Sequence, residues 1–223
     1  TQPCSSAASD VYKRQGHSLG EFSSLVANNT ISFEDGLKLV FLRAKAMQKS
    51  CENSNGTMAA ILGLDDKIIK ETCESFDGNV TAANFNCPGQ VVISGELNAV
   101  KMICEKFNEI GARRSILLPV GGAFHSNLMN DAKSELKEAI HKTKFNNPTC
   151  PIYQNFTAQK TTSIDIIKQN LINQLTAPVL WTQTINNMVN DGYLDYTEVG
   201  PGKVLQGLIR KINRETITQS ALS

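Results

Sequence analysis

The chain has 223 residues, 41% of them hydrophobic, and its 22 basic and 21 acidic side chains give a formal net charge of +1. This composition is ordinary for one globular domain with a real core, with room for an inserted subdomain. The balanced charge gives no support for a nucleic-acid partner, which would need a basic stripe, and the apolar runs are too short to span a bilayer.

The first part of the chain stands apart from the rest. Positions 5–15 contain the string SSAASDVYKRQ, which matches the frame translation of a transposase adapter used to prepare DNA sequencing libraries. We therefore interpret residues 1–15 as a non-native segment and exclude them from fold reasoning. The alternative is a natural disordered N-terminus. On the first interpretation the native sequence resumes at Gly16, and the chain lacks its true N-terminal region.

From Gly16 onward, the apolar periodicity predicts helices at 21–27 and 34–51. Ser32 and Asp35 form an N-cap box at the start of the second helix. The apolar residues that recur along this helix are Leu37, Val40, Phe41, Ala44 and Met47.

Residues 57–119 follow the order strand, helix, strand, strand, helix, strand. This βαββαβ order is the pattern of a ferredoxin-like subdomain, here expected as a compact insertion. Its elements are expected at 58–62, 65–76, 80–84, 91–94, 96–110 and 115–119.

The segments on either side, 16–56 and 120–223, are expected to form the main core. Strands alternate there with helices, which predicts a mostly parallel sheet and an α/β fold class. The helices are expected at 126–142, 163–175, 181–190 and 204–212, and the strands at 151–156 and 195–199.

A possible nucleophile lies at the start of the native sequence. Gly16, Ser18 and Gly20 match the G-x-S-x-G elbow of α/β-hydrolase-like enzymes, in which a serine sits on a tight strand-to-helix turn. The amide of Leu19 would then point at a developing oxyanion. These five residues alone fit an ordinary glycine-rich turn equally well.

A serine nucleophile needs a base, and the chain offers three histidines. His17 adjoins Ser18, so its side chain diverges from the serine, and His141 lies in a charged helix end typical of a solvated residue. His125 lies in a loop between a strand and a helix, where α/β folds hold catalytic groups. A loop histidine taken alone is more often structural.

Arg43 lies on an apolar face of the 34–51 helix. A buried guanidinium needs a partner, and a bidentate carboxylate of a substrate would supply one. The alternative is a local ion pair with Glu34 or Asp35.

Longer strings in the chain resemble one enzyme family. They are GHSLGEFSSLVA at the elbow, LVFLRAKAMQ around Arg43, NFNCPGQ at 84–90, LPVGGAFHSNLM around His125 and EVGPGKVL at 198–205. Together they resemble the malonyl-CoA:acyl-carrier-protein transacylases of fatty-acid synthesis, and the resemblance extends over nearly all of the chain from Gly16.

The resemblance implies specific roles for these residues. Ser18 would carry the acyl group, His125 would be its base, and a backbone carbonyl at Gln174 would orient the histidine. Arg43 would hold the malonyl carboxylate, and Phe124 is typical of malonyl-selective members. The family needs no cofactor and acts on malonyl-CoA and the phosphopantetheine thiol of acyl carrier protein, and we expect a monomer.

The chain departs from the family pattern at one point. It contains no N-terminal G-Q-G-x-Q segment, which in the family helps to close the substrate site and accompanies the second oxyanion amide. The loss of one oxyanion donor typically costs about a hundredfold in rate. Three alternatives to the transacylase therefore stay open: a serine hydrolase or thioesterase, an inactive truncated fragment, and an acyltransferase domain of a polyketide synthase.

The cysteines complete the prediction. They show no CxxC pair and no metal-type spacing to the histidines, so we expect reduced thiols in a cytoplasmic protein and no metal site. They are Cys4, Cys51, Cys73, Cys87, Cys104 and Cys150.

Overall fold

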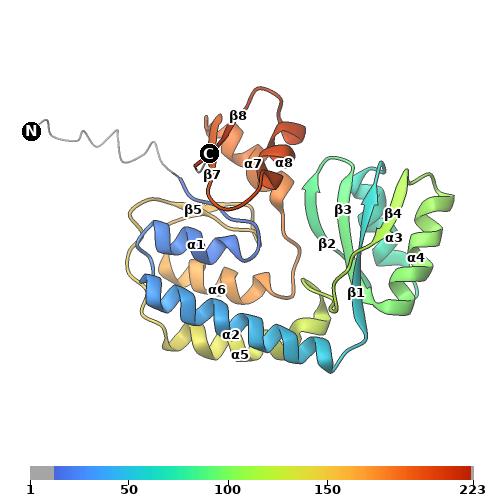
Figure 1. Cartoon of the computed structure of the whole chain (residues 1–223), viewed down its shortest axis with the longest axis horizontal. Coiled ribbons are helices and arrows are strands. Elements are labelled where there is room, and N and C mark those ends of the chain that lie inside the picture. The colour runs from blue at the N-terminus through green and yellow to red at the C-terminus, as the bar shows by residue number, and fades with distance from the viewer. Residues whose placement is uncertain (1–12, 222–223) are drawn as a thin grey trace, which may run out of the picture.

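The computed structural model describes residues 13–221. Cys4 and most of the adapter-like string lie outside these residues, and the five cysteines within them are free thiols. No helix in the described part of the chain is both long and apolar enough to cross a membrane. Figure 1 shows a lobe of stacked helices, a sheet covered by two helices beside it, and a smaller C-terminal group above the helical lobe.

The helical lobe is built around α1 (Gly20–Ala27) and α2 (Phe33–Glu52). The predicted cap of α2 is present, since the Ser32 hydroxyl accepts a 3.0 Å hydrogen bond from the Asp35 amide. The α5 helix (Asn130–Lys142) packs along α2, and α6 (Ile164–Gln174) packs against α5 (Figure 1). A short 3-10 turn at Asn127–Met129 precedes α5.

The buried face of α2 differs from the apolar stripe that the sequence indicated. Leu37 and Phe41 of the expected stripe are 60% and 62% exposed, whereas Met47 is buried as expected. The same buried face includes Leu39, Arg43 and Ala46. The buried residues are those that face α1 and α5, and these contacts decide which side of the helix is covered. Spacing alone could not separate two apolar stripes on one helix.

The second lobe is a four-stranded antiparallel sheet with strand order β2-β3-β1-β4. Its elements follow one another as β1 (Gly56–Leu62), α3 (Asp66–Ser75), β2 (Val80–Cys87), β3 (Gln90–Glu96), α4 (Leu97–Glu109) and β4 (Arg114–Leu117).

Alternation along its strands gives this sheet two buried faces. Ala59 and Ile61 pack under α3 and α4 with Phe107, whereas Met58 and Val92 on the opposite face pack with the loop that contains Phe124. The sheet is therefore joined to the helical lobe through that loop.

The C-terminal group contains α7 (Trp181–Asn190), β7 (Asp195–Glu198), α8 (Val204–Ile212) and β8 (Ile217–Ser220). The mostly parallel sheet expected for the main core is not formed by the described residues, where parallel pairing is limited to β7 with β8 and to single bridges. The strand expected at 151–156 is only β5 (Ile152–Tyr153), which pairs antiparallel with β6 (Lys160–Thr161). It ends there because the backbone turns back, with the Ala158 amide bonded to the Gln154 carbonyl. The sequence predicted neither β6 nor β8.

Candidate active site

Ser18 lies on a sharp turn immediately before α1. Its φ is +51°, a left-handed conformation that residues other than glycine rarely adopt. Arg14, in the segment interpreted as non-native, forms a parallel bridge with Ile152, so the backbone before the turn is paired in this chain. A Cβ on Gly16 would lie 2.0 Å from the carbonyl carbon of Gly20, so only glycine fits where the chain crosses itself. This is the geometry of a nucleophile elbow.

Ser18 and His125 meet across the site although 107 residues separate them. The Ser18 Oγ lies 2.8 Å from Nε2 of His125, and Nδ1 of the same ring lies 2.9 Å from the carbonyl oxygen of Gln174. A carbonyl oxygen only accepts hydrogen bonds, so the proton resides on Nδ1 and Nε2 is free to accept from the serine hydroxyl. The three residues thus form a hydroxyl–imidazole–carbonyl chain with the polarity that a general base requires.

His125 is held as a neutral base. The side chain is buried, and this burial lowers its pKa to about 4, an effect that the Gln174 carbonyl opposes and the Arg43 charge reinforces. Its own φ is +59°, so the backbone at both reacting residues is in the left-handed region. Unusual backbone at two facing residues is typical of a functional site.

Arg43 reaches the same point from α2. Its Nη2 donates a 2.9 Å hydrogen bond to Ser18 Oγ, and the guanidinium lies 5.9 Å from the ring centre of Phe22. The side chain is 5% exposed, and burial lowers its pKa to about 10, so it stays charged at neutral pH. Its Nε has no hydrogen-bond partner among the described residues. A buried cation with spare donors is suited to an anionic ligand.

The local ion pair considered for Arg43 is not formed. Glu34 binds Lys38, at 2.8 Å, and Asp35 accepts a hydrogen bond from Ser32. Both acids lie at the exposed start of α2, whereas Arg43 points inward.

Two further predicted residues flank this cluster. Leu19 is the N-cap residue of α1, with helical dihedral angles (φ −53° and ψ −38°), and its side chain is 48% exposed. Its amide therefore belongs to the N-terminal end of α1, the position of an oxyanion donor. Phe124 is half-buried and packs against both the helical lobe and the sheet.

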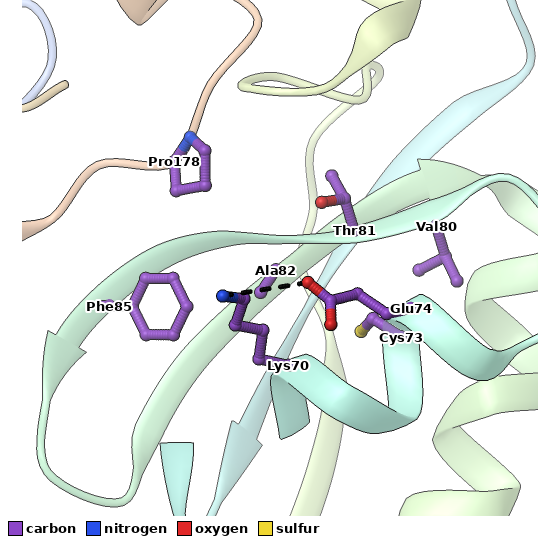
Figure 2. A pocket seen from close by; sticks show the side chains of 8 residues that line it. All are labelled: Lys70, Cys73, Glu74, Val80, Thr81, Ala82, Phe85 and Pro178. Atoms are coloured by element: carbon purple, nitrogen blue, oxygen red, sulfur yellow. Dashed lines mark ion pairs between the residues drawn. The ribbon is translucent and has the colours of Figure 1, made fainter. Parts of the chain in front are cut away.

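The other two histidines lie apart from the reacting groups. His17 turns away from Ser18, as expected, and its Nε2 lies 2.9 Å from Asn86 Oδ1, with the ring against Trp181. His141 is exposed near the end of α5. A cavity of about 130 Å³ between α3, β2 and Pro178 is lined by none of the predicted residues, and its Lys70–Glu74 ion pair lies at its rim (Figure 2). The predicted site residues that gather around Ser18 therefore lie outside this cavity.

Comparison with known proteins identifies the family of the chain. Residues 15–222 match the model of the acyl transferase domain family. The chain belongs to this family.

Individual members of the family are similar to the chain over most of its length. The malonyl CoA-acyl carrier protein transacylases of Staphylococcus aureus strain MRSA252 and Bacillus subtilis strain 168 are 40% and 42% identical to it, over 90% and 91% of the chain. These alignments cover 66% and 65% of the relatives, so the chain spans about two thirds of their length. The crystal structure of an acyl-carrier-protein S-malonyltransferase from Burkholderia pseudomallei superposes with a TM-score of 0.91 at 38% identity, covering 95% of this chain and 69% of that one.

This acyl transferase domain also contains a buried polar group that sequence reasoning did not assign. Glu21 is fully buried one turn after Ser18, and its Oε2 accepts hydrogen bonds from Gln174 Nε2 and from the Asn155 amide. Burial raises its pKa to about 7, which its hydrogen bonds and the Arg43 charge oppose. Its only sequence signal was its place in the elbow string.

Gln174 has a second role that the sequence did not indicate. Besides presenting its carbonyl to His125, its side chain donates to the Ser18 carbonyl at 3.2 Å. One residue at the end of α6 thus contacts the backbone of Ser18 and the ring of His125. Asn155, which follows β5, completes this network and was also missed.

Proposed function

We propose that this acyl transferase domain moves a malonyl group from malonyl-CoA to the phosphopantetheine thiol of acyl carrier protein, a step of fatty acid biosynthesis, through an ester on Ser18. The observation that carries the proposal is Arg43, a buried cation within 2.9 Å of the oxygen that would be acylated. The names of the relatives, which are transacylases for malonyl groups, point to the same substrate.

In the first half-reaction, Ser18 Oγ attacks the thioester carbonyl carbon while Nε2 of His125 takes the hydroxyl proton. The Leu19 amide donates to the oxyanion of the tetrahedral intermediate. When the intermediate collapses, the carbon–sulfur bond breaks, and His125 returns its proton to the departing CoA sulfur.

The second half-reaction runs the same steps with a different thiol. His125 removes the proton of the phosphopantetheine thiol, whose sulfur attacks the malonyl-serine ester. Collapse of the second intermediate breaks the bond to Ser18 Oγ, which recovers its proton from His125. The neutral ring that burial produces is the form that both half-reactions start from.

Arg43 explains why a malonyl group fits. In a malonyl thioester a single methylene separates the carboxylate from the reacting carbonyl, so the anion must bind close to the nucleophile. The guanidinium that contacts Ser18 Oγ has this short reach, and its unused Nε leaves room for a bidentate contact. An acetyl group would leave the buried charge without its anion, so it would be disfavoured.

The same proposal covers the finer architecture. We infer that residues 57–119 are a ferredoxin-like subdomain inserted into an α/β-hydrolase-like core formed by 16–56 and 120–223. The strand order β2-β3-β1-β4 supports the first part, and the elbow at Ser18 supports the second. We further propose that the protein acts as a monomer in the cytoplasm. The proposed mechanism uses only side chains, backbone groups and thioesters, so we propose that it needs no metal or organic cofactor.

A transfer assay tests the function. The protein is incubated with labelled malonyl-CoA, and loss of the label from the protein is followed with and without phosphopantetheinylated carrier protein. The transacylase predicts rapid movement of label to the carrier and slow release to water. Equal release of the label with and without carrier would instead establish a hydrolase.

The role of Phe124 is tested separately. Phe124→Ala removes a half-buried ring next to His125 in the sequence and should weaken the preference for malonyl-CoA over other acyl-CoA thioesters.

A further inference from the structure

The side chain of Asn155 is hydrogen-bonded to the backbone of the turn that contains Ser18. Its side chain is fully buried, Nδ2 donates to the Gly16 carbonyl at 2.7 Å, and Oδ1 accepts from the Ser18 amide at 2.6 Å. One carboxamide thus binds the backbone on both sides of His17. These are among the shortest hydrogen bonds of the turn, and neither involves a group that reacts.

The side chain of Asn155 continues the hydrogen bonding of a short parallel strand pair after the backbone pairing has ended. Arg14 occupies the position before the elbow in this chain, although we interpret it as part of the non-native segment. Its amide donates to the Pro151 carbonyl, and its carbonyl accepts from the Tyr153 amide, as in a parallel pair. Beyond Tyr153 the backbone turns away, and the backbone amide of Asn155 binds Glu21 Oε2 instead. The side-chain amide of Asn155 takes its place opposite the elbow, where a regular strand would have offered a peptide group.

The turn requires such support because Ser18 is in a left-handed conformation. Its carbonyl accepts hydrogen bonds from Gln174 Nε2, at the end of α6, and from the Glu21 amide, in α1. Its amide is held by Asn155. Without that contact, the Ser18 peptide can rotate, and the direction of Oγ toward His125 is no longer determined from the strand side.

We infer that Asn155 is a positioning residue that fixes the Ser18 elbow and thereby sets the approach of Oγ to Nε2 of His125. The inference rests on the proposed role of Ser18 as the nucleophile. The hydrogen bonds of Asn155 in the described part of the chain go to Gly16, Ser18 and Glu21, and none of them goes to Arg43 or to the ring of His125. We therefore expect its effect on the rate of acylation and not on the binding of the carboxylate.

The chain contains a matched control for this inference. Asn28 is also fully buried, its Oδ1 accepts from the Thr30 amide, and its Nδ2 donates to the Cys150 carbonyl, both at 3.2 Å. It lies just past the far end of α1 from Ser18. Replacing either asparagine removes one hydrogen bond from a backbone amide and one to a backbone carbonyl. Replacing Asn28 also removes the 2.6 Å hydrogen bond that its Oδ1 accepts from the Thr30 hydroxyl. Only Asn155 touches the elbow.

The experiment measures the reaction of Ser18 itself. Asn155→Ala, Asn155→Asp, Asn28→Ala and Asn28→Asp are compared with the unchanged chain, and the folded fraction of each is determined by circular dichroism. Two reagents are titrated separately: malonyl-CoA and a fluorophosphonate, which phosphonylates an activated serine with loss of fluoride. For each, the maximal labelling rate per folded molecule is measured separately from the half-saturating concentration.

We expect Asn155→Ala to lower the maximal rate about a hundredfold with both reagents, as a misplaced nucleophile does, with little change in the half-saturating concentration. Asn155→Asp keeps the acceptor for the Ser18 amide and should lose less. The Asn28 variants should lose stability but keep the rate.

Three outcomes would overturn the inference. Equal rates per folded molecule for the Asn155 and Asn28 variants would make Asn155 an ordinary scaffold residue, as would failure of both Asn155 variants to fold while both Asn28 variants fold. A loss confined to the half-saturating concentration would make it a binding residue. A parent chain that reacts with the fluorophosphonate but not with malonyl-CoA would refute the proposed substrate and leave the positioning of Ser18 to be decided by the fluorophosphonate rates.

Discussion

Replacement of Arg43 by methionine should separate activity from stability. The guanidinium is buried, carries its charge at neutral pH and has one hydrogen bond to Ser18 and an unpartnered Nε. Methionine retains most of the apolar volume of the side chain and removes the charge. The malonyl carboxylate then loses its counter-ion, while the ligand-free protein loses a group that is costly to bury.

The magnitudes follow from these contacts. Removing one partner of a buried, hydrogen-bonded charge pair costs about 3 kcal/mol, which is roughly a hundredfold in kcat/KM for malonyl-CoA. Acetyl-CoA lacks the carboxylate, so its kcat/KM should stay level or rise. The free energy of unfolding of the ligand-free chain should be unchanged or higher by about 1–3 kcal/mol, because replacing buried ions by apolar groups is often stabilising.

The assay measures acylation of Ser18 by malonyl-CoA and by acetyl-CoA, together with urea unfolding at about pH 6, where Glu21 is mostly protonated. Lys45→Met is the matched control, because it removes an exposed cation from the same helix and should change neither quantity. If Arg43→Met reduces both acylation rates equally, or sharply destabilises the ligand-free protein, then Arg43 is a structural residue and the reasoning fails.

Three further predictions concern the groups around the serine. The pKa of Glu21 is raised to about 7, so its contribution to stability is complete below about pH 4.5 and is lost as the pH rises through about 7. At pH 8 the free energy of unfolding of Glu21→Gln, measured with urea, should therefore exceed that of the unchanged chain by about 3 kcal/mol. His125 has a lowered pKa, so the rate of Ser18 labelling in the Glu21→Gln background should persist down to about pH 5 and fall near 4; a midpoint near 6.5 would contradict the burial argument. Gly16→Ala should abolish labelling, since its Cβ meets backbone at 2.0 Å, whereas Gly20→Ala has open space and should retain it, although both glycines belong to the motif.

The sequence predicted the separate blocks of the site well. The spacing of Gly16 and Ser18, the loop around His125 and the apolar face that carries Arg43 all lie where the elements were expected, and the structure brings these residues within hydrogen-bond distance. Such motifs are local, so they can be found without knowledge of the fold. The meeting of Ser18 with His125 came from the family resemblance, because no pattern within one segment encodes a contact across 107 residues.

Other features depend on tertiary contacts that leave little trace in one sequence. Glu21 and Asn155 look like ordinary polar residues, yet both are fully buried because each satisfies backbone or side-chain partners from distant segments. The strand β5 stops after Tyr153 because the following residues form a turn. The sequence-based prediction, which relied on apolar content, extended the strand to residue 156. The exposed stripe through Phe41 shows the same limit, since only packing partners decide which apolar face is covered.

The most direct test of the account is the site of acylation. The chain is incubated with malonyl-CoA beside Ser18→Ala, and each protein is analysed by intact mass and then by peptide mapping. The account predicts one malonyl group per molecule, located on the peptide that contains Ser18, absent from the variant and discharged by carrier protein. A folded chain that gains no malonyl group, or one that gains it equally in Ser18→Ala, would contradict the central claim.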